Sequence, residues 1–217
     1  MNDYIGHPLQ LSGAEEVVLA RGRGKGMTLL KIRNGKGLNI TLSVDRCMDI
    51  SRLSFKGDNI GFFAPCGYVA PTYYDDKDDG FLKSFTAGFL TTCGLTAVGS
   101  PCIDNGEKLP LHGTIANTPC DSFNYFETEN EVVAEATVRD ARLFGNCLLL
   151  KRRYTFSKIC NSIKINDVVE NIGSKTTPCM LLYHFNMGYP LLQEDSVVSI
   201  PNPGVTPRNA HAADSLG

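Results

Sequence analysis

The residues best suited to moving protons near neutral pH are the four histidines, His7, His112, His184 and His211. His112 leaves a loop-rich stretch, and His184 ends an apolar run that leads into a Gly/Pro turn. An imidazole at such a place can donate or accept a proton, as acid–base chemistry requires. A core histidine that merely satisfies its own hydrogen bonds is the alternative at each position, and spacing alone does not decide between the two.

Two opposite charges, Arg46 and Asp49, lie in a segment that should be largely buried between strands. Burying an unpaired charge is costly, so each must pair with the other, with a neighbour or with a ligand. A structural Arg–Asp pair and a role in binding hydroxyl groups both stay open.

Two further motifs predict connections rather than sites. The glycine-rich residues 21–26 lack the spacing and the following helix of a phosphate-binding loop, so they predict a hairpin connection. The acidic run 75–79 predicts a solvated loop, with a calcium loop as the alternative. No Cys/His cluster has the spacing of a structural zinc site, and we expect no metal and no cofactor.

The elements that must position these residues are strands. Apolar and polar residues alternate along Leu38–Val44, which is typical of a half-buried strand. Similar segments, separated by turn residues, span 27–33, 131–138, 148–156, 162–169 and 196–200. Between residues 65 and 119 the alternation fades, which predicts loops over one end or face of the sheet and a short helix near 82–89. The pattern predicts an all-β protein with one domain over residues 1–217.

Composition excludes several classes of protein. Hydrophobic residues make up 42% of the 217 residues and the net charge is −2, so the chain can bury a core and has no basic field for nucleic acid. No apolar stretch approaches the length of a membrane helix, and residues 1–10 do not resemble a secretory signal. We expect a cytoplasmic protein whose eight cysteines are mostly buried thiols, the apolar run Cys179–Tyr183 being a buried strand. Residues 198–217 predict either a disordered tail or the N-terminal part of a longer chain, and we favour the second.

An ordered set of motifs resembles the galactose mutarotase-like (aldose 1-epimerase) superfamily, most closely its DUF4432 branch. The set covers about residues 27 to 200. Its members are Asp45–Ile50 ("DRxxDI"), Gly88–Leu95 ("GxLxTCGL"), Gly99–Pro101, Leu111–Gly113 ("LHG") and Tyr183–Leu192 ("YHxNxGYPLL").

The resemblance implies a large antiparallel β-sandwich with a sugar site, and a reaction that interconverts the α and β anomers of a reducing sugar. By motif, two histidines are catalytic: His184 is the acid facing the ring oxygen, and His112 binds a hydroxyl and helps to stabilise developing charge. Further candidates for sugar contacts are Arg46, Asp49, Thr92 and Asn186. The expected partner is a small-molecule sugar, with oligomeric state left open.

One departure from the family concerns the base. The superfamily uses a glutamate on a strand near the C-terminus, and no residue of this chain fills that place; Glu194 follows His184 too closely. Whether the chain is an enzyme is therefore undecided by its sequence. A non-catalytic carbohydrate-binding protein on the same fold is the main alternative, and a structural domain without a sugar ligand is the third.

Overall fold

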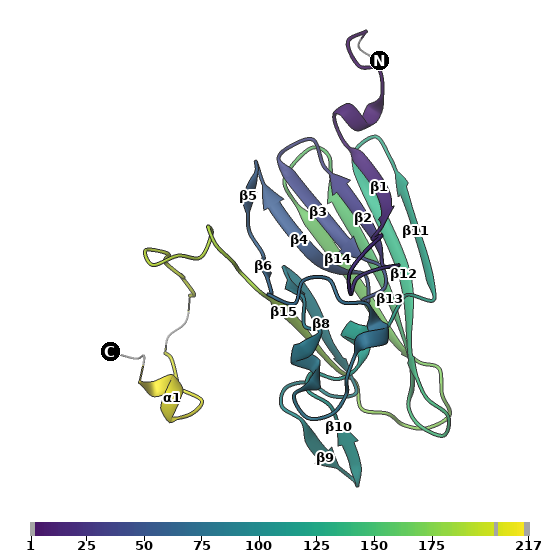
Figure 1. Ribbon diagram of the computed structural model, residues 1–217, viewed down its shortest axis with the longest axis vertical. Helices are drawn as coiled ribbons and strands as arrows, with labels where there is room; N and C mark the ends of the chain where they lie inside the picture. The colour runs from purple at the N-terminus through teal and green to yellow at the C-terminus, as the bar shows by residue number, and fades with distance from the viewer. Residues whose placement is uncertain (1–2, 202–203, 215–217) are drawn as a thin grey trace.

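The structure, a computed structural model, describes residues 3–201 and 204–214 and consists mainly of antiparallel strands (Figure 1). A five-stranded sheet has the order β1-β2-β3-β4-β5, and a four-stranded sheet has the order β11-β12-β13-β14. The strands of the first sheet are β1 Gly13–Val18, β2 Thr28–Arg33, β3 Leu38–Ser43, β4 Asp49–Phe55 and β5 Asp58–Asn59. Those of the second are β11 Ser122–Glu127, β12 Glu131–Ala141, β13 Cys147–Ser157 and β14 Ile163–Asn171.

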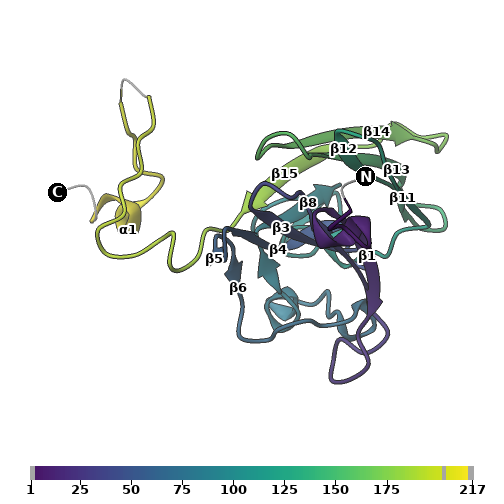
Figure 2. The ribbon, with the colours of Figure 1, turned by 90° about the horizontal axis from the view of Figure 1, so that it is seen from above.

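The two sheets pack face to face as the layers of a sandwich, which Figure 2 shows from above. Leu30 and Ile50 of the first sheet and Val132 and Phe156 of the second are fully buried in one shared cluster. Burying an aliphatic or aromatic side chain of this size contributes about 1.5–3 kcal/mol, so the shared core holds the layers together. The prediction of an all-β sandwich is confirmed.

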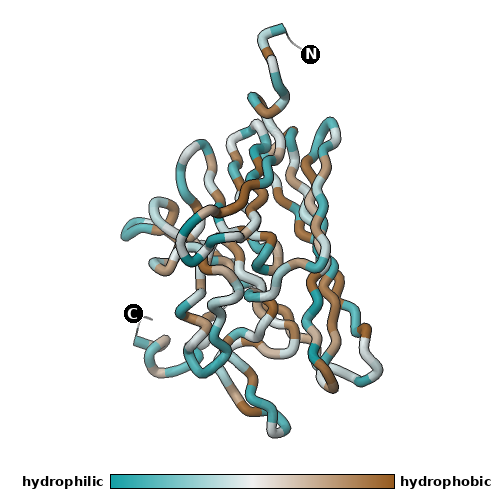
Figure 3. Tube along the Cα trace, turned by 45° about the vertical axis from the view of Figure 1, so that its right-hand side comes forward, coloured by the Kyte–Doolittle hydropathy of each residue, from teal (hydrophilic) through white to brown (hydrophobic). Residues whose placement is uncertain are grey.

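Alternation of side chains decides which face of each strand enters the core. In β13 the inward positions 148, 150, 152, 154 and 156 are buried, while the positions between them are half-buried or exposed. The tube in Figure 3 shows hydrophilic and hydrophobic residues alternating along the strands. Strands β2, β3, β12, β13 and β14 occur where alternation predicts them. Residues 21–26 join β1 to the antiparallel β2, as predicted for a hairpin connection.

The loop-rich stretch carries short elements that surround a third, two-stranded sheet. That sheet pairs β8, Leu90–Leu95, with β15, Met180–Phe185. The other short strands are β6 Phe62–Phe63, β7 Ala87–Gly88, β9 Cys102–Asp104 and β10 Glu107–Leu109. Short 3-10 helices lie at η1 Pro8–Gln10, η2 Pro71–Tyr73, η3 Gly80–Lys83 and η4 Ile115–Asn117, and one α-helical turn, α1, at Ala210–Ala213.

Two predicted elements are wrong. Residues 82–89 do not form a helix: η3 stops at Lys83, and Ala87 and Gly88 have φ of 58° and 74°, which a right-handed helix cannot accommodate. Residues 196–200 do not form a strand, because no segment among the described residues pairs with them.

The prediction for the cysteines is also wrong in part. All eight are free thiols, but only Cys47 and Cys93 are buried, and Cys102, Cys160 and Cys179 are exposed. The run that begins at Cys179 does form a strand, β15, yet most of its side chains are exposed. The reason is that β15 pairs only with β8, so its other edge has no neighbour in the part of the chain that the structure describes.

The segment after β15 leads away from the sheets toward α1, as Figures 1 and 2 both show. Two parts of the segment 198–217, for which a disordered tail was one prediction, lie outside the described residues: 202–203 and 215–217. None of the helices described is both long and apolar enough to cross a membrane.

Candidate functional site

The structure brings two distant histidines together. His184 lies on β15, and His112 lies in the loop between β10 and η4. Their ring centroids are 5.4 Å apart, and the ring planes are nearly perpendicular at 81°. Two imidazoles at this separation can contact the same small ligand, so the pair is the candidate site.

Two phenylalanines close a cycle of four rings with the histidines. Phe81 lies 5.5 Å from His112, Phe85 lies 5.8 Å from His184, and the two phenylalanine rings are 5.1 Å apart. Phe81 is buried, whereas Phe85 and both histidines are half-buried. The cycle therefore gives the imidazoles an apolar wall with one partly accessible phenylalanine. Neither phenylalanine was a candidate from the sequence.

Glycine backbones hold the His112 loop against β8. Gly94 of β8 forms a bridge with Gly113, donates to the carbonyl of His112 at 3.0 Å and accepts from Thr114 at 3.1 Å. Gly113 has φ of 72°, and a Cβ there would overlap the carbonyl oxygens of Gly94 and Ala97. The glycines of "TCGL" and "LHG" thus allow a close approach of two backbones, and this approach places His112.

The orientation of His112 is fixed by its neighbour Gly99. The His112 amide donates to the Gly99 carbonyl at 2.9 Å, and the Gly99 amide donates to Nδ1 of His112 at 3.3 Å. An Nδ1 that accepts a hydrogen bond leaves the proton on Nε2, so this imidazole presents an N–H donor. Burial, and after it the nearby charge of His184, lowers the pKa of His112 below 6.5. His112 is therefore suited to donate a hydrogen bond as a neutral ring.

His184 has one ring nitrogen without a partner. Its Nδ1 is buried and makes no hydrogen bond to any described residue. Asn186 lies beside it, with its side-chain amide donating to the His184 carbonyl at 3.1 Å. A buried imidazole nitrogen without a partner is costly, and such atoms often occur at functional sites.

Thr92 of β8 points to the face of the β8–β15 pair that is opposite His184, and Asp49 of β4 contacts Thr92 there. Thr92 pairs across the ladder with Tyr183, the neighbour of His184, so its side chain points away from the imidazole. Asp49 accepts from the Thr92 amide at 2.8 Å and from the Thr92 hydroxyl at 2.6 Å. Burial raises the pKa of Asp49, and Arg152 opposes this rise.

Arg152 is the centre of that buried network. Its guanidinium has no exposed surface and pairs with Asp49 at 2.8 Å and with Asp167 at 2.7 Å, and the Tyr183 hydroxyl donates to Asp167 at 2.8 Å. One cation thus links β4, β8 and β14, with Tyr183 attaching β15. Asp49 pairs with Arg152 rather than directly with Arg46, an arrangement that sequence reasoning missed.

Arg46 hydrogen-bonds the loop that carries Phe85. It is buried, and its Nη1 donates to the carbonyls of Val69 at 3.1 Å and Ser84 at 2.8 Å. Burial lowers its pKa, and the charge of Asp49 opposes the change. A role in binding sugar stays a prediction for Arg46, as it does for Asp49, Thr92 and Asn186.

The described residues offer no metal site. Their His, Cys, Asp and Glu side chains form no group of three or more that could hold an ion. In the acidic run 75–79, Asp75 instead pairs with Lys83 at 2.8 Å.

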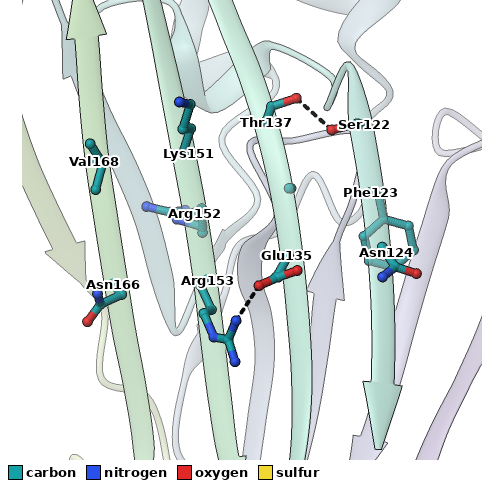
Figure 4. A pocket seen from close by; sticks show the side chains of 11 residues that line it. Ser122, Phe123, Asn124, Glu135, Thr137, Lys151, Arg152, Arg153, Asn166 and Val168 are labelled. Atoms are coloured by element: carbon teal, nitrogen blue, oxygen red, sulfur yellow. Dashed lines mark hydrogen bonds and ion pairs between the residues drawn. The ribbon is translucent and has the colours of Figure 1, made fainter.

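A separate groove lies on the outer face of β11 to β14 (Figure 4). Its volume is about 480 Å³, and neither histidine lines it. Its exposed charged and hydroxyl groups are already paired: Arg153 with Glu135, Lys151 with Glu170, and Ser122 with Thr137 at 2.6 Å. We interpret this groove as a solvated sheet face.

Comparison with known proteins agrees with the motifs. A family model described as "Domain of unknown function (DUF4432)" matches residues 24–217. The chain belongs to the DUF4432 family. No curated protein matches this DUF4432 chain in sequence.

Two solved structures resemble the DUF4432 chain. A protein described as a putative aldose 1-epimerase, from Klebsiella pneumoniae subsp. pneumoniae MGH 78578, superimposes with a TM-score of 0.76 at 26% identity, over 83% of this chain and 49% of that one. A galactose 1-epimerase from Lactobacillus acidophilus NCFM has a TM-score of 0.45 at 16% identity, over 68% of this chain and 45% of that one. The chain thus spans about half the length of the structures it matches.

Proposed function

We propose that this protein binds a reducing sugar beside His112 and His184 and interconverts its anomers, as an aldose 1-epimerase does. The observation that carries the proposal is the meeting of the two imidazoles at 5.4 Å. The resemblance to the Klebsiella protein supports it. Two half-buried imidazoles with an apolar wall are suited to a small polyhydroxyl ligand.

The reaction assigns each imidazole a task. His184 donates a proton to the ring oxygen while a base removes the proton of the anomeric hydroxyl, and the bond between C1 and the ring oxygen breaks to give an aldehyde. Rotation about C1–C2 and the reverse proton transfers close the ring as either anomer. His112, neutral and with its proton on Nε2, donates a hydrogen bond to a hydroxyl and orients the sugar.

A second candidate is a sugar-binding protein without catalysis. Among the described residues, neither imidazole hydrogen-bonds a carboxylate, and the epimerase reaction needs a base for the anomeric hydroxyl. Binding alone needs only the donors and the apolar wall that the described site has. This observation favours the second candidate, and the similarity to the Klebsiella protein favours the first.

Saturation-transfer NMR between the α and β anomers of a panel of reducing sugars separates the two. We expect exchange faster than in buffer, and its loss by at least about 100-fold in His184→Ala. The matched control is His211→Ala, in the distant α1. Sugar-dependent shifts without exchange would establish the binding protein. Neither shifts nor exchange would overturn both candidates.

A further inference from the structure

The half-buried Phe85 completes the cycle of four rings and lies edge to face with His184. We propose that Phe85 is a specificity-determining residue that stacks against the apolar C–H face of the sugar ring. The proposal rests on the function proposed above, because it concerns the same site.

The chemistry of a pyranose explains why an aromatic ring would matter here. One or both faces of the ring expose C–H groups, while the hydroxyls project around its rim. Donors such as His112 satisfy the hydroxyls, and an aromatic side chain can cover the C–H face at little cost in conformational entropy. Phe81 cannot serve, since it is only 1% exposed. Phe85 is the accessible phenylalanine of the cycle.

Hydrogen bonds on both sides of Phe85 hold it in place before any ligand binds. Arg46 donates to the Ser84 carbonyl at 2.8 Å, and the Thr86 hydroxyl donates to the Gly67 carbonyl at 3.0 Å. The thiol of Cys66 donates to the carbonyl of Phe85 itself at 3.2 Å. With its backbone held in this way and its ring packed against Phe81 and His184, Phe85 loses little freedom on binding, which favours affinity.

The same arrangement favours a neutral sugar over a phosphorylated one. Arg46, the cation that holds the Phe85 loop, has its Nη1 bonded to the carbonyls of Val69 and Ser84. A buried guanidinium committed to backbone oxygens cannot also turn to a phosphate without losing those bonds. We therefore expect neutral pyranoses with an uninterrupted C–H face to bind better than their phosphates.

The absence of tryptophan from the sequence allows a direct test. Phe85→Trp introduces a single tryptophan at the site, and Phe126→Trp introduces one on the outer face of β11, where Phe126 is 38% exposed. We expect a saturable change in emission when glucose or galactose is added to Phe85→Trp, none with Phe126→Trp, and a weaker response to the corresponding 6-phosphates.

Kinetics of Phe85→Leu complete the test. We expect KM for anomer exchange to rise about 3- to 10-fold, because the sugar loses one aromatic contact, while kcat changes less than about twofold. Phe63→Leu, a phenylalanine that packs under Arg52, is the control. If Phe85→Leu does not fold, Phe85→Trp still decides, because it keeps an aromatic ring.

The outcomes separate the two proposals. Wild-type exchange with an unchanged KM in Phe85→Leu and a silent Phe85→Trp would overturn the role of Phe85 and leave the epimerase proposal standing. No binding and no exchange in the wild type would overturn both. Equal responses to sugars and their 6-phosphates would overturn the preference for neutral sugars.

Discussion

The rings of His112 and His184 meet edge to face, and each of them also contacts a phenylalanine. Burial beside Phe81 and, after it, the charge of His184 lower the pKa of His112. The geometry therefore favours His112 as a neutral ring.

The first prediction concerns the titration of His112. Its NMR-detected midpoint should lie below about 6.5, the usual value for an exposed histidine, because burial and then the His184 charge lower its pKa. In His184→Ala the midpoint of His112 should rise only part of the way toward 6.5, since burial is the larger cause of the lowered pKa. A midpoint above 6.5 in the wild type would contradict the proposed neutral donor.

A second prediction follows for stability against pH. Since the folded state holds the His112 proton less tightly than the unfolded chain does, His112 opposes folding at low pH. This destabilisation is absent above about pH 6.5 and grows as the pH falls below that value. His112→Asn should therefore lose less stability between pH 7 and pH 5 than the wild type in urea unfolding. An equal loss of stability in the two proteins would argue against a contribution of His112 to the pH dependence.

The third prediction compares two adjacent arginines of β13. Arg152→Met leaves the buried carboxylates of Asp49 and Asp167 without their cation and should cost about 3–5 kcal/mol of unfolding free energy. Arg153→Met breaks an exposed pair with Glu135 and should cost less than about 1 kcal/mol. Urea unfolding measures both. The deficit of Arg152→Met should shrink as the pH falls, because protonation neutralises the uncompensated carboxylates.

The fourth prediction compares two glycines with left-handed backbones. Gly99, with φ of 81°, has open space where a Cβ would lie, so Gly99→Ala should cost only the conformational penalty of about 1–2 kcal/mol. Gly113→Ala adds an overlap with the carbonyls of Gly94 and Ala97, and should cost more and reduce anomer exchange. Similar losses in the two variants would mean that β8 and the His112 loop can separate without consequence.

The fifth prediction concerns Tyr183. Burial and the hydrogen bond to Asp167 raise its pKa to about 12. The difference in phenolate absorbance between the wild type and Tyr183→Phe should therefore have a midpoint near 12, and Asp167→Asn should lower it. A midpoint near 10, the ordinary value, would show that β15 is not anchored to β14 through this hydroxyl.

Alternation predicted β2, β3, β12, β13 and β14, because the core of the sandwich repeats every second residue along each of them, but it did not predict β1, β4, β5 or β11. Alternation also failed at residues 196–200, which have no partner strand among the described residues, and the apolar run of β15 forms a strand that is largely exposed. In both cases a local pattern indicated burial that depends on a neighbour elsewhere. The loop-rich residues 65–119 carried no period from which their 3-10 helices could be predicted.

The site was predictable only in part. Motif resemblance selected His112 and His184, but their contact depends on long-range packing that spacing cannot supply. The partner of Asp49 was missed because Arg152 lies between two other basic residues and looks like part of an exposed cluster. One signal could have found it: Arg152 occupies the inward parity of β13, in line with Leu150 and Tyr154. Phe85 had no such signal.

The buried network of Asp49, Arg152 and Asp167 also restricts how this sequence can diverge. Losing Arg152 leaves two buried carboxylates without their cation, and losing either aspartate leaves part of the buried guanidinium without its hydrogen-bond partner, whereas exchanging all three for apolar residues of similar volume removes these groups together. Single substitutions thus cross a barrier that a concerted replacement avoids. Among descendants of this sequence, the three positions should change as a unit or stay as they are.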